Sequence, residues 1–353
     1  MVSFLTLPAE LRALVIYQVL CSENNPPSRP FENGRIDFQD IDYRAWRSRA
    51  KILNENRNQH CPSNVASLLR TNRQLSAETQ AILDIERQKS KLRYALDISV
   101  LHDYTLFVTW LSVPWISNRV DSLVANIRLF GHILPQEIAK TLSGDGGRLG
   151  FHWSFYAVLE RFLRYGPVDG KKTQTKGDSK KSFYRRNPTF EDRDMTVKEL
   201  TLNIDSAEDS LEFPPDEIDY RRWSTRHHGI ERFRHPQAAS DELIKYRTRP
   251  EWLAKYLLGE IRGLLYMGYH TASYGKILYE SIGTLRVVAG GEEIATVDLA
   301  SELASLSFND PGDTFGDVWP RENRIPAFWE WKKQTLERRQ QLGFPVVWPK
   351  DQN

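Results

Sequence analysis

The sequence predicts an α+β fold in which an N-terminal helical segment packs on a mixed sheet flanked by helices. The hydrophobic period changes from about 3.6 to about 2 residues near residue 92, which indicates a passage from helices to strands. The alternation of apolar and polar residues that is typical of strands recurs near residues 127, 201 and 286, and segments with helical periodicity lie between these positions. The 353 residues are 40% hydrophobic and include 10 Trp, 14 Tyr and 16 Phe, which is enough apolar material for a large core.

Composition and charge exclude several classes of protein. Lys and Arg number 48 and Asp and Glu number 46, so the net charge of +2 gives no global case for binding nucleic acid or a membrane surface. The two cysteines, Cys21 and Cys61, favour a reducing compartment. The sequence has neither the pattern of a signal peptide nor an apolar run of about 18 residues. We therefore expect a cytoplasmic protein, a nuclear one or both, without a membrane partner.

Residues 1–90 are predicted to form a helical region with a polar insertion at 21–64. The first helix is expected from Pro8 to about Leu20, because proline suits the first helical turn, where no amide donor is needed. Its apolar residues recur at helical spacing on one face, namely Leu11, Leu14, Val15 and Val19. A second helix is expected after Asn64, with a buried stripe of Val65, Leu68, Leu69, Leu75, Ile82 and Leu83.

Residues 91–345 are predicted to form the α+β body. Its first unit is expected to be a strand from Leu92 to Val100, a helix from Tyr104 to Ile116 and a strand from Leu123 to Phe130. The two strands of this βαβ unit are expected to lie parallel, joined by a right-handed crossover.

The rest of the body is predicted to continue the sheet in mostly sequential order. A hairpin is expected at 285–297, because Gly290 and Gly291 both tolerate the positive φ of a primed turn. The spacing between strands is too long for leucine-rich repeats of about 20–29 residues. The other expected elements are helices over 151–165, from Pro250 and from Pro326, a strand over 197–204, and flexible loops near 169–194 and 205–240.

Two stretches of the N-terminal region carry a family resemblance. Residues 4–12 read Phe-Leu-Thr-Leu-Pro-Ala-Glu-Leu-Arg, and residues 68–78 read Leu-Leu-Arg-Thr-Asn-Arg-Gln-Leu-Ser-Ala-Glu. Together they resemble the F-box-like domain of filamentous-fungal proteins. That family typically has a Leu-Pro-x-Glu-Leu-Arg helix start and, after a variable insertion, a Leu-Leu-Arg-x-x-Arg-Gln-x-x-x-Glu block. The resemblance covers residues 4 to about 83.

The resemblance implies a protein-interaction adaptor. F-box proteins are substrate receptors of Skp–cullin–F-box ubiquitin ligases, so the implied partners are a Skp-type adaptor and an unknown protein substrate. An F-box alone is too small to bury all of its apolar surface, so its remaining face docks on partner helices. The residues implied to face the adaptor or to complete the helical domain are Leu7, Pro8, Leu11, Val15, Leu68 and Leu69.

A second interpretation is a stand-alone protein-interaction or structural module. In that case the F-box-like helices are internal core, because any amphipathic helix pair produces the same apolar stripe. The exposure of Leu7, Pro8 and Leu11 in the folded protein distinguishes the two interpretations.

A third interpretation is a nucleic-acid-binding protein. Basic and aromatic residues are interleaved in a basic-aromatic patch, as they are in the grooves of proteins that bind single-stranded nucleic acids. An acidic run at 205–219 lies just upstream and would neutralise much of the field of the patch, so we favour paired or solvated charges. A second basic stretch at 171–186 has the composition of a nuclear-import signal. The patch consists of Arg221, Arg222, Trp223, Arg226, Arg232 and Phe233.

Motifs of enzyme chemistry are absent from the sequence. The glycines at 144–150 do not fit a dinucleotide-binding pattern, and Ser273 lacks the first glycine of a nucleophile elbow. His227, His228 and His235 have no partners at metal-ligand spacing. We therefore expect a protein that is not an enzyme, with no catalytic residue, cofactor or metal.

Overall fold

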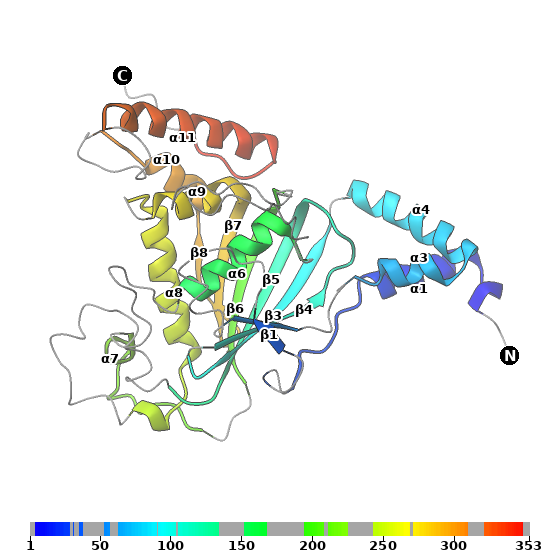
Figure 1. Cartoon of the computed structure of the whole chain (residues 1–353), viewed down its shortest axis with the longest axis horizontal. Helices are drawn as coiled ribbons and strands as arrows, with labels where there is room; N and C mark the ends of the chain where they lie inside the picture. The colour runs from blue at the N-terminus through cyan, green and yellow to red at the C-terminus, as the bar shows by residue number, and fades with distance from the viewer. Residues whose placement is uncertain are drawn as a thin grey trace, which may run out of the picture.

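The computed structural model describes residues 4–28, 31, 35–37, 53–56, 63–89, 91–103, 105–133, 152–167, 194–207, 211–224, 243–268, 271–309 and 321–348. They form an α+β structure, as predicted, with a mixed sheet and helices on it (Figure 1). Four helical elements project from one side of this body in Figure 1, and we call them the head. The head consists of η1 (Phe4–Thr6), α1 (Ala9–Leu20), α3 (Val65–Thr71) and α4 (Arg73–Lys89).

The sheet has eight strands in the described residues, in the order β1-β2-β4-β3-β5-β6-β7-β8. The four central neighbours β3, β5, β6 and β7 are parallel, whereas β4 pairs antiparallel with β3 and β8 pairs antiparallel with β7. The strand bounds are β1 (Arg35–Asp37), β2 (Leu53–Asn56), β3 (Arg93–Leu101), β4 (Thr105–Ser112), β5 (Arg119–Phe130), β6 (Thr196–Ser206), β7 (Ile282–Ala289) and β8 (Glu292–Val297).

Helices cover one face of this sheet: α6 crosses in front of the strands in Figure 1, and α8, to the left in that view, contacts β6, β7 and β8. Because side chains alternate between the faces of a strand, the buried Ile127, Ile204 and Val287 lie on the helix-covered face. The body helices are α6 (His152–Tyr165), α7 (Tyr220–Ser224), η4 (Leu243–Lys245), α8 (Pro250–Leu265), α9 (Ala272–Ser281), α10 (Leu299–Ser305), η5 (Arg321–Asn323) and α11 (Arg324–Gln341). None of the described helices has both the length and the apolar character needed to cross a membrane.

The opposite face of the sheet carries polar side chains that bind one another across neighbouring strands. Asn203 donates to the side-chain oxygen of Asn126 at 3.0 Å. Arg286 forms ion pairs with Glu199 at 3.3 Å and with Glu293 at 2.7 Å. This polar ladder explains why strands β5, β6 and β7 alternate in burial.

Several expected elements are present where the sequence predicts them. Helices α1, α6 and α8 begin within one residue of the expected starts, and α11 begins two residues before Pro326. Strands β7 and β8 form the expected hairpin, with φ values of 57° at Gly290 and 84° at Gly291. The parallel pairing of β3 with β5 is also confirmed.

The expected helix from Tyr104 to Ile116 is wrong, because residues 105–112 form strand β4. This strand lies inside the sheet between β2 and β3, and the side chains on both of its faces are buried. A strand buried on both faces loses the period-2 alternation that identifies a half-buried strand. The first unit of the body is therefore a β3–β4 hairpin followed by a parallel β5.

The N-terminal region differs from the expectation in two further ways. The single expected second helix is two helices, α3 and α4, because Asn72 is extended with φ −160° and its side chain accepts from the amide of Leu75 at 2.9 Å. The insertion at 21–64 contributes β1 and β2, and β2 continues the sheet by pairing parallel with β4. Nearly all of the expected loop at 169–194, parts of the expected loop at 205–240 and the glycines at 144–150 lie outside the described residues. Within the second of these expected loops, residues 220–224 form helix α7, so the expectation is wrong there.

Hydrogen bonds attach the head to the end of β4. Asn24 follows α1, and both its amide and its side chain donate to the carbonyl of Leu111, at 2.9 and 3.2 Å. Ser63 precedes α3 and donates to the carbonyl of Pro114 at 3.1 Å. The base of the head is therefore fixed, while most of α1 lies beyond the sheet (Figure 1).

Candidate functional site

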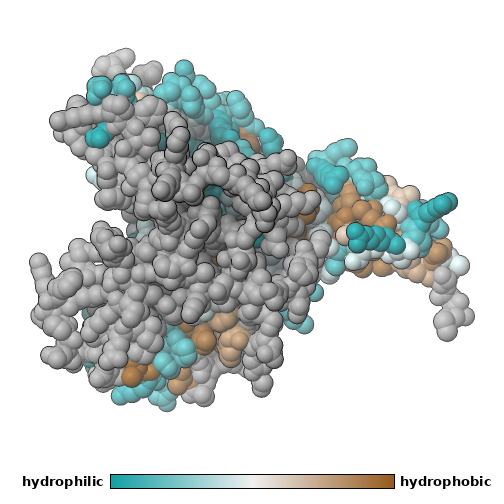
Figure 2. Space-filling model, viewed as in Figure 1, coloured by the Kyte–Doolittle hydropathy of each residue, from teal (hydrophilic) through white to brown (hydrophobic). Residues whose placement is uncertain are grey.

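Helix α1 has two apolar faces, and only one of them is covered. Ile16 and Leu20 are buried in the core on the side of α4. The other side exposes Leu11, Leu14 and Val15, at 49%, 60% and 44% of their surface, and also Val19. Single exposed apolar residues are ordinary, but several on one helix face are typical of a binding surface. Hydrophobic residues also gather on the side of the head that Figure 2 shows. We call Leu11, Leu14, Val15 and Val19 the α1 face.

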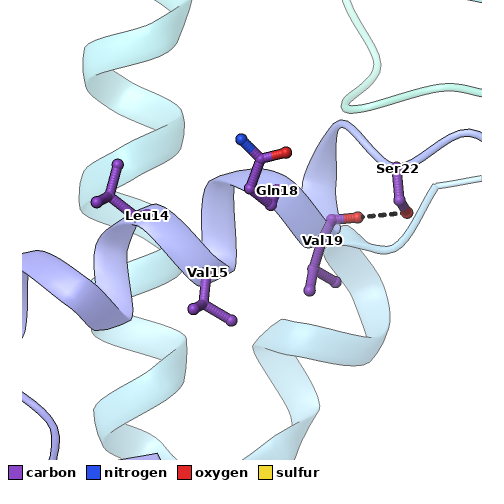
Figure 3. A pocket seen from close by; sticks show the side chains of 5 residues that line it. All are labelled: Leu14, Val15, Gln18, Val19 and Ser22. Atoms are coloured by element: carbon purple, nitrogen blue, oxygen red, sulfur yellow. Dashed lines mark hydrogen bonds between the residues drawn. The ribbon is translucent and has the colours of Figure 1, made fainter.

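A shallow hollow opens on the C-terminal half of the α1 face (Figure 3). Ser22 closes its far end and donates to the carbonyl of Val19 at 2.9 Å. Asn64, just before α3, donates to the same carbonyl at 2.8 Å and to Ser22 Oγ at 3.1 Å. Two of these bonds satisfy the carbonyl of Val19, which lies in the last turn of α1, where carbonyls have no partner within the helix. The hollow is lined by Leu14, Val15, Gln18, Val19 and Ser22.

Arg12 and Glu78 join the two stretches that carry the family resemblance. Arg12 Nε lies 3.1 and 3.0 Å from the two carboxylate oxygens of Glu78, and Arg12 Nη2 lies 2.6 Å from Oε1. Gln74 also donates to Glu78, at 3.1 Å. The bond from Arg12 lowers the pKa of the Glu78 carboxyl, and the bond to Glu78 raises the pKa of Arg12. Both side chains are therefore charged across the neutral pH range.

The residues that the resemblance assigns to the adaptor interface divide into two groups. Pro8, Leu11 and Val15 are exposed. Leu7, Leu68 and Leu69 are half-buried, and Leu68 packs against the core. The assignment missed Leu14 and Val19, although both belong to the same helical stripe in the sequence. Leu5, in η1, was also missed and is exposed, and no periodic pattern extends to it.

The basic-aromatic patch is not a continuous surface in the part of the chain that is described. Trp223 is fully buried, and its indole N–H donates to Asp103 Oδ2 at 3.0 Å. The ring is therefore closed to a nucleobase and could not take the stacking role that the nucleic-acid interpretation would give it. Arg221 is exposed and Arg222 is half-buried, whereas Arg226, Arg232 and Phe233 lie outside the described residues.

A polar group that the sequence analysis missed lies among the body helices. His152 Nδ1 is 2.9 Å from the hydroxyl of Tyr256, and His152 Nε2 is 3.3 Å from Glu260 Oε2. Burial raises the pKa of the Tyr256 phenol well above its ordinary value, so the phenol stays protonated. The arrangement suits a hydrogen-bonded link between α6 and α8, in which the phenol is protonated rather than a nucleophile.

Metal and thiol chemistry have little support in the described residues. No three His, Cys, Asp or Glu side chains are placed together to hold a metal ion in the ranges that the structure describes. His227, His228, His235 and Cys61 lie outside those ranges. Burial raises the pKa of the Cys21 thiol, which keeps it in the less reactive protonated form.

The geometry therefore leaves the α1 face and the hollow as the strongest candidate site. Comparisons with protein-family models, with curated proteins and with solved structures found no match.

Proposed function

We propose that the head docks on a Skp-type adaptor and that the body receives a protein substrate, so that the chain acts as an F-box-like interaction adaptor. The observation that carries the proposal is the exposed α1 face, on a helix whose opposite face is already buried. The ordered pair of motifs supports it, because Arg12 of the first motif binds Glu78 of the second.

The chemistry of the α1 face suits docking between helices. Burying one Leu or Val side chain contributes about 1.5–3 kcal/mol, so a few of these residues in a partner groove supply useful affinity. In this role the chain performs no covalent step, and the transfer of ubiquitin belongs to other subunits of the ligase. A membrane or a nucleic acid has no part in the proposal.

The stand-alone module has less support. It requires the body to cover Leu7, Pro8 and Leu11, whereas Pro8 and Leu11 are exposed and α1 projects beyond the sheet (Figure 1). Nucleic-acid binding by the basic-aromatic patch also has less support, because Trp223 is buried.

The proposal is tested by titrating the full chain with a purified Skp-type adaptor in a calorimeter. Leu11→Asp places a charge on the α1 face and is expected to weaken binding by about a hundredfold or more, because an unpaired charge at a buried contact is costly. Ile294→Asp is the matched control, since Ile294 is a similarly exposed residue on β8 of the body. Absence of binding by the unaltered chain, or equal binding by Leu11→Asp, would contradict the proposal.

A further inference from the structure

The turn that precedes α1 is held by the side chain of Arg12. Arg12 Nη1 donates to the carbonyl of Leu7 and, at 3.3 Å, to the carbonyl of Leu5. The other two nitrogens of the same guanidinium bind Glu78 on α4. One side chain thus connects residues 5–7 to α4, and only 11% of it is exposed.

This turn carries two exposed apolar residues directly before α1. Leu5 and Pro8 are exposed, and Pro8 is directly followed by α1. Within the turn, the amide of Leu7 donates to the carbonyl of Phe4 at 3.2 Å, which shapes η1 but does not connect it to α4. The contact between Arg12 and the two carbonyls supplies that connection.

We propose that Arg12 is a positioning residue that holds Leu5 and Pro8 in the arrangement that the adaptor binds, with Glu78 as its anchor. The inference rests on the proposed function and extends it, because it assigns part of the docking affinity to a side chain that need not touch the adaptor. Holding the turn in its bound form before docking reduces the entropy that binding must overcome.

The geometry of arginine explains why this residue type is needed. Its guanidinium is planar and offers donors in two directions, so it can bind a carboxylate on one side and carbonyls on the other. Lysine carries the same charge but concentrates its donors at one point, so it can serve only one side well. Holding α1 against α4 depends less on Arg12, because the buried Ile16 and Leu20 already pack on that side.

The test compares four variants of the full chain in calorimetric titrations with a purified Skp-type adaptor. Arg12→Leu removes the ion pair and both carbonyl contacts, and Arg12→Lys keeps the charge. The exchange of Arg12→Glu with Glu78→Arg restores an ion pair but leaves a carboxylate beside the carbonyls. Arg87→Leu is the matched control, because Arg87 is an exposed arginine at the end of α4 whose ion pair with Asp84 is 3.6 Å long.

We expect Arg12→Leu to weaken binding by about tenfold or more, and Arg12→Lys by a smaller factor. The charge exchange is expected to bind as weakly as Arg12→Leu, while Arg87→Leu binds like the unaltered chain. Amide hydrogen exchange at residues 4–7 is expected to accelerate in Arg12→Leu and Arg12→Lys without acceleration in the strands of the body. This second measurement also identifies a variant that has simply lost its fold.

Two results would overturn the inference and leave the proposed function intact. One is equal binding by Arg12→Leu and the unaltered chain, in an experiment in which Leu11→Asp abolishes binding. The other is full recovery of binding by the charge exchange, which would assign the role to the ion pair alone. Absence of binding by the unaltered chain would instead overturn the proposed function and this inference together.

Discussion

Trp223 and Asp103, which are 120 residues apart, meet in the interior, where the indole N–H donates to the carboxylate at 3.0 Å. Thr248 donates to the same carboxylate at 2.6 Å. Asp103 lies in the β3–β4 turn, Trp223 in α7, and Thr248 just before α8. This carboxylate therefore joins three segments that the sheet alone does not hold together.

Loss of the Asp103 carboxylate is expected to be strongly destabilising. Asp103→Ala leaves a buried indole N–H and a buried hydroxyl without their acceptor, at a cost of about 1–3 kcal/mol each. Asp103→Asn keeps an acceptor and tolerates the φ of 54° at this position, so its loss is expected to be smaller. Urea unfolding followed by Trp fluorescence measures both. A loss below about 0.5 kcal/mol for Asp103→Ala would contradict this account.

Removal of the Thr79 hydroxyl is expected to stabilise the fold. Its side chain on α4 is fully buried, and its hydroxyl has no hydrogen-bond partner within the described structure. Thr79→Val keeps the shape and removes the unsatisfied hydroxyl, so stability is expected to rise by about 1 kcal/mol. Thr248→Val is the control and is expected to lose stability, because the Thr248 hydroxyl is bonded to Asp103. Equal changes in the free energy of unfolding for the two variants, measured with urea, would contradict the account of Thr79 as a buried hydroxyl without a hydrogen-bond partner.

Glycine-to-alanine substitutions are expected to have opposite signs in two neighbouring helices. A Cβ at Gly275 in α9 would overlap the carbonyl oxygen of Leu264 and the sulfur of Met267, so Gly275→Ala is expected to cost about 1–3 kcal/mol. A Cβ at Gly259 in α8 meets nothing within 4 Å, so Gly259→Ala is expected to stabilise by about 1 kcal/mol through helix propensity. Thermal unfolding of the two variants provides the comparison, and a shift in the same direction for both would be the contrary result.

Glu280 is expected to give the fold a pH dependence. Burial raises the pKa of its carboxyl, and its Oε1 accepts from the indole of Trp331 at 2.6 Å. A carboxyl with a raised pKa binds its proton more tightly in the folded state than in the unfolded state. The stability that it contributes is therefore present at low pH and is lost as the pH rises through the folded pKa.

Glu280→Gln removes this loss, because a neutral amide keeps an acceptor for Trp331 and carries no buried charge. We expect the variant to be more stable than the unaltered chain at pH 7.5 and about equal to it at pH 4. Glu302→Gln, on an exposed residue of α10, is the control and is expected to change little at either pH. A gain at pH 4 that is absent at pH 7.5 would reverse the sign and refute the argument.

Much of the fold could be predicted where local signals are strong. Pro250 starts a helix, the pair Gly290 and Gly291 forms a tight turn, and the alternation after residue 196 forms a strand. Strand β4 could not be predicted in this way, because both of its faces are buried and its pattern has no alternation. The role of Trp223 could not be predicted either, because its acceptor Asp103 is distant in the chain.

The sequence predicts that α1 is a helix with an apolar stripe, and this stripe lies in a pair of motifs that resemble an F-box-like domain. It did not determine which side of α1 is covered, because Ile16 and Leu20 form one apolar side and Leu11, Leu14 and Val15 form another. Helical periodicity specifies the angle between side chains but not which side meets a neighbouring element. The packing of the folded chain places α4 and the core against the first side and leaves the α1 face exposed. It also brings Arg12 to Glu78, 66 residues away in the sequence.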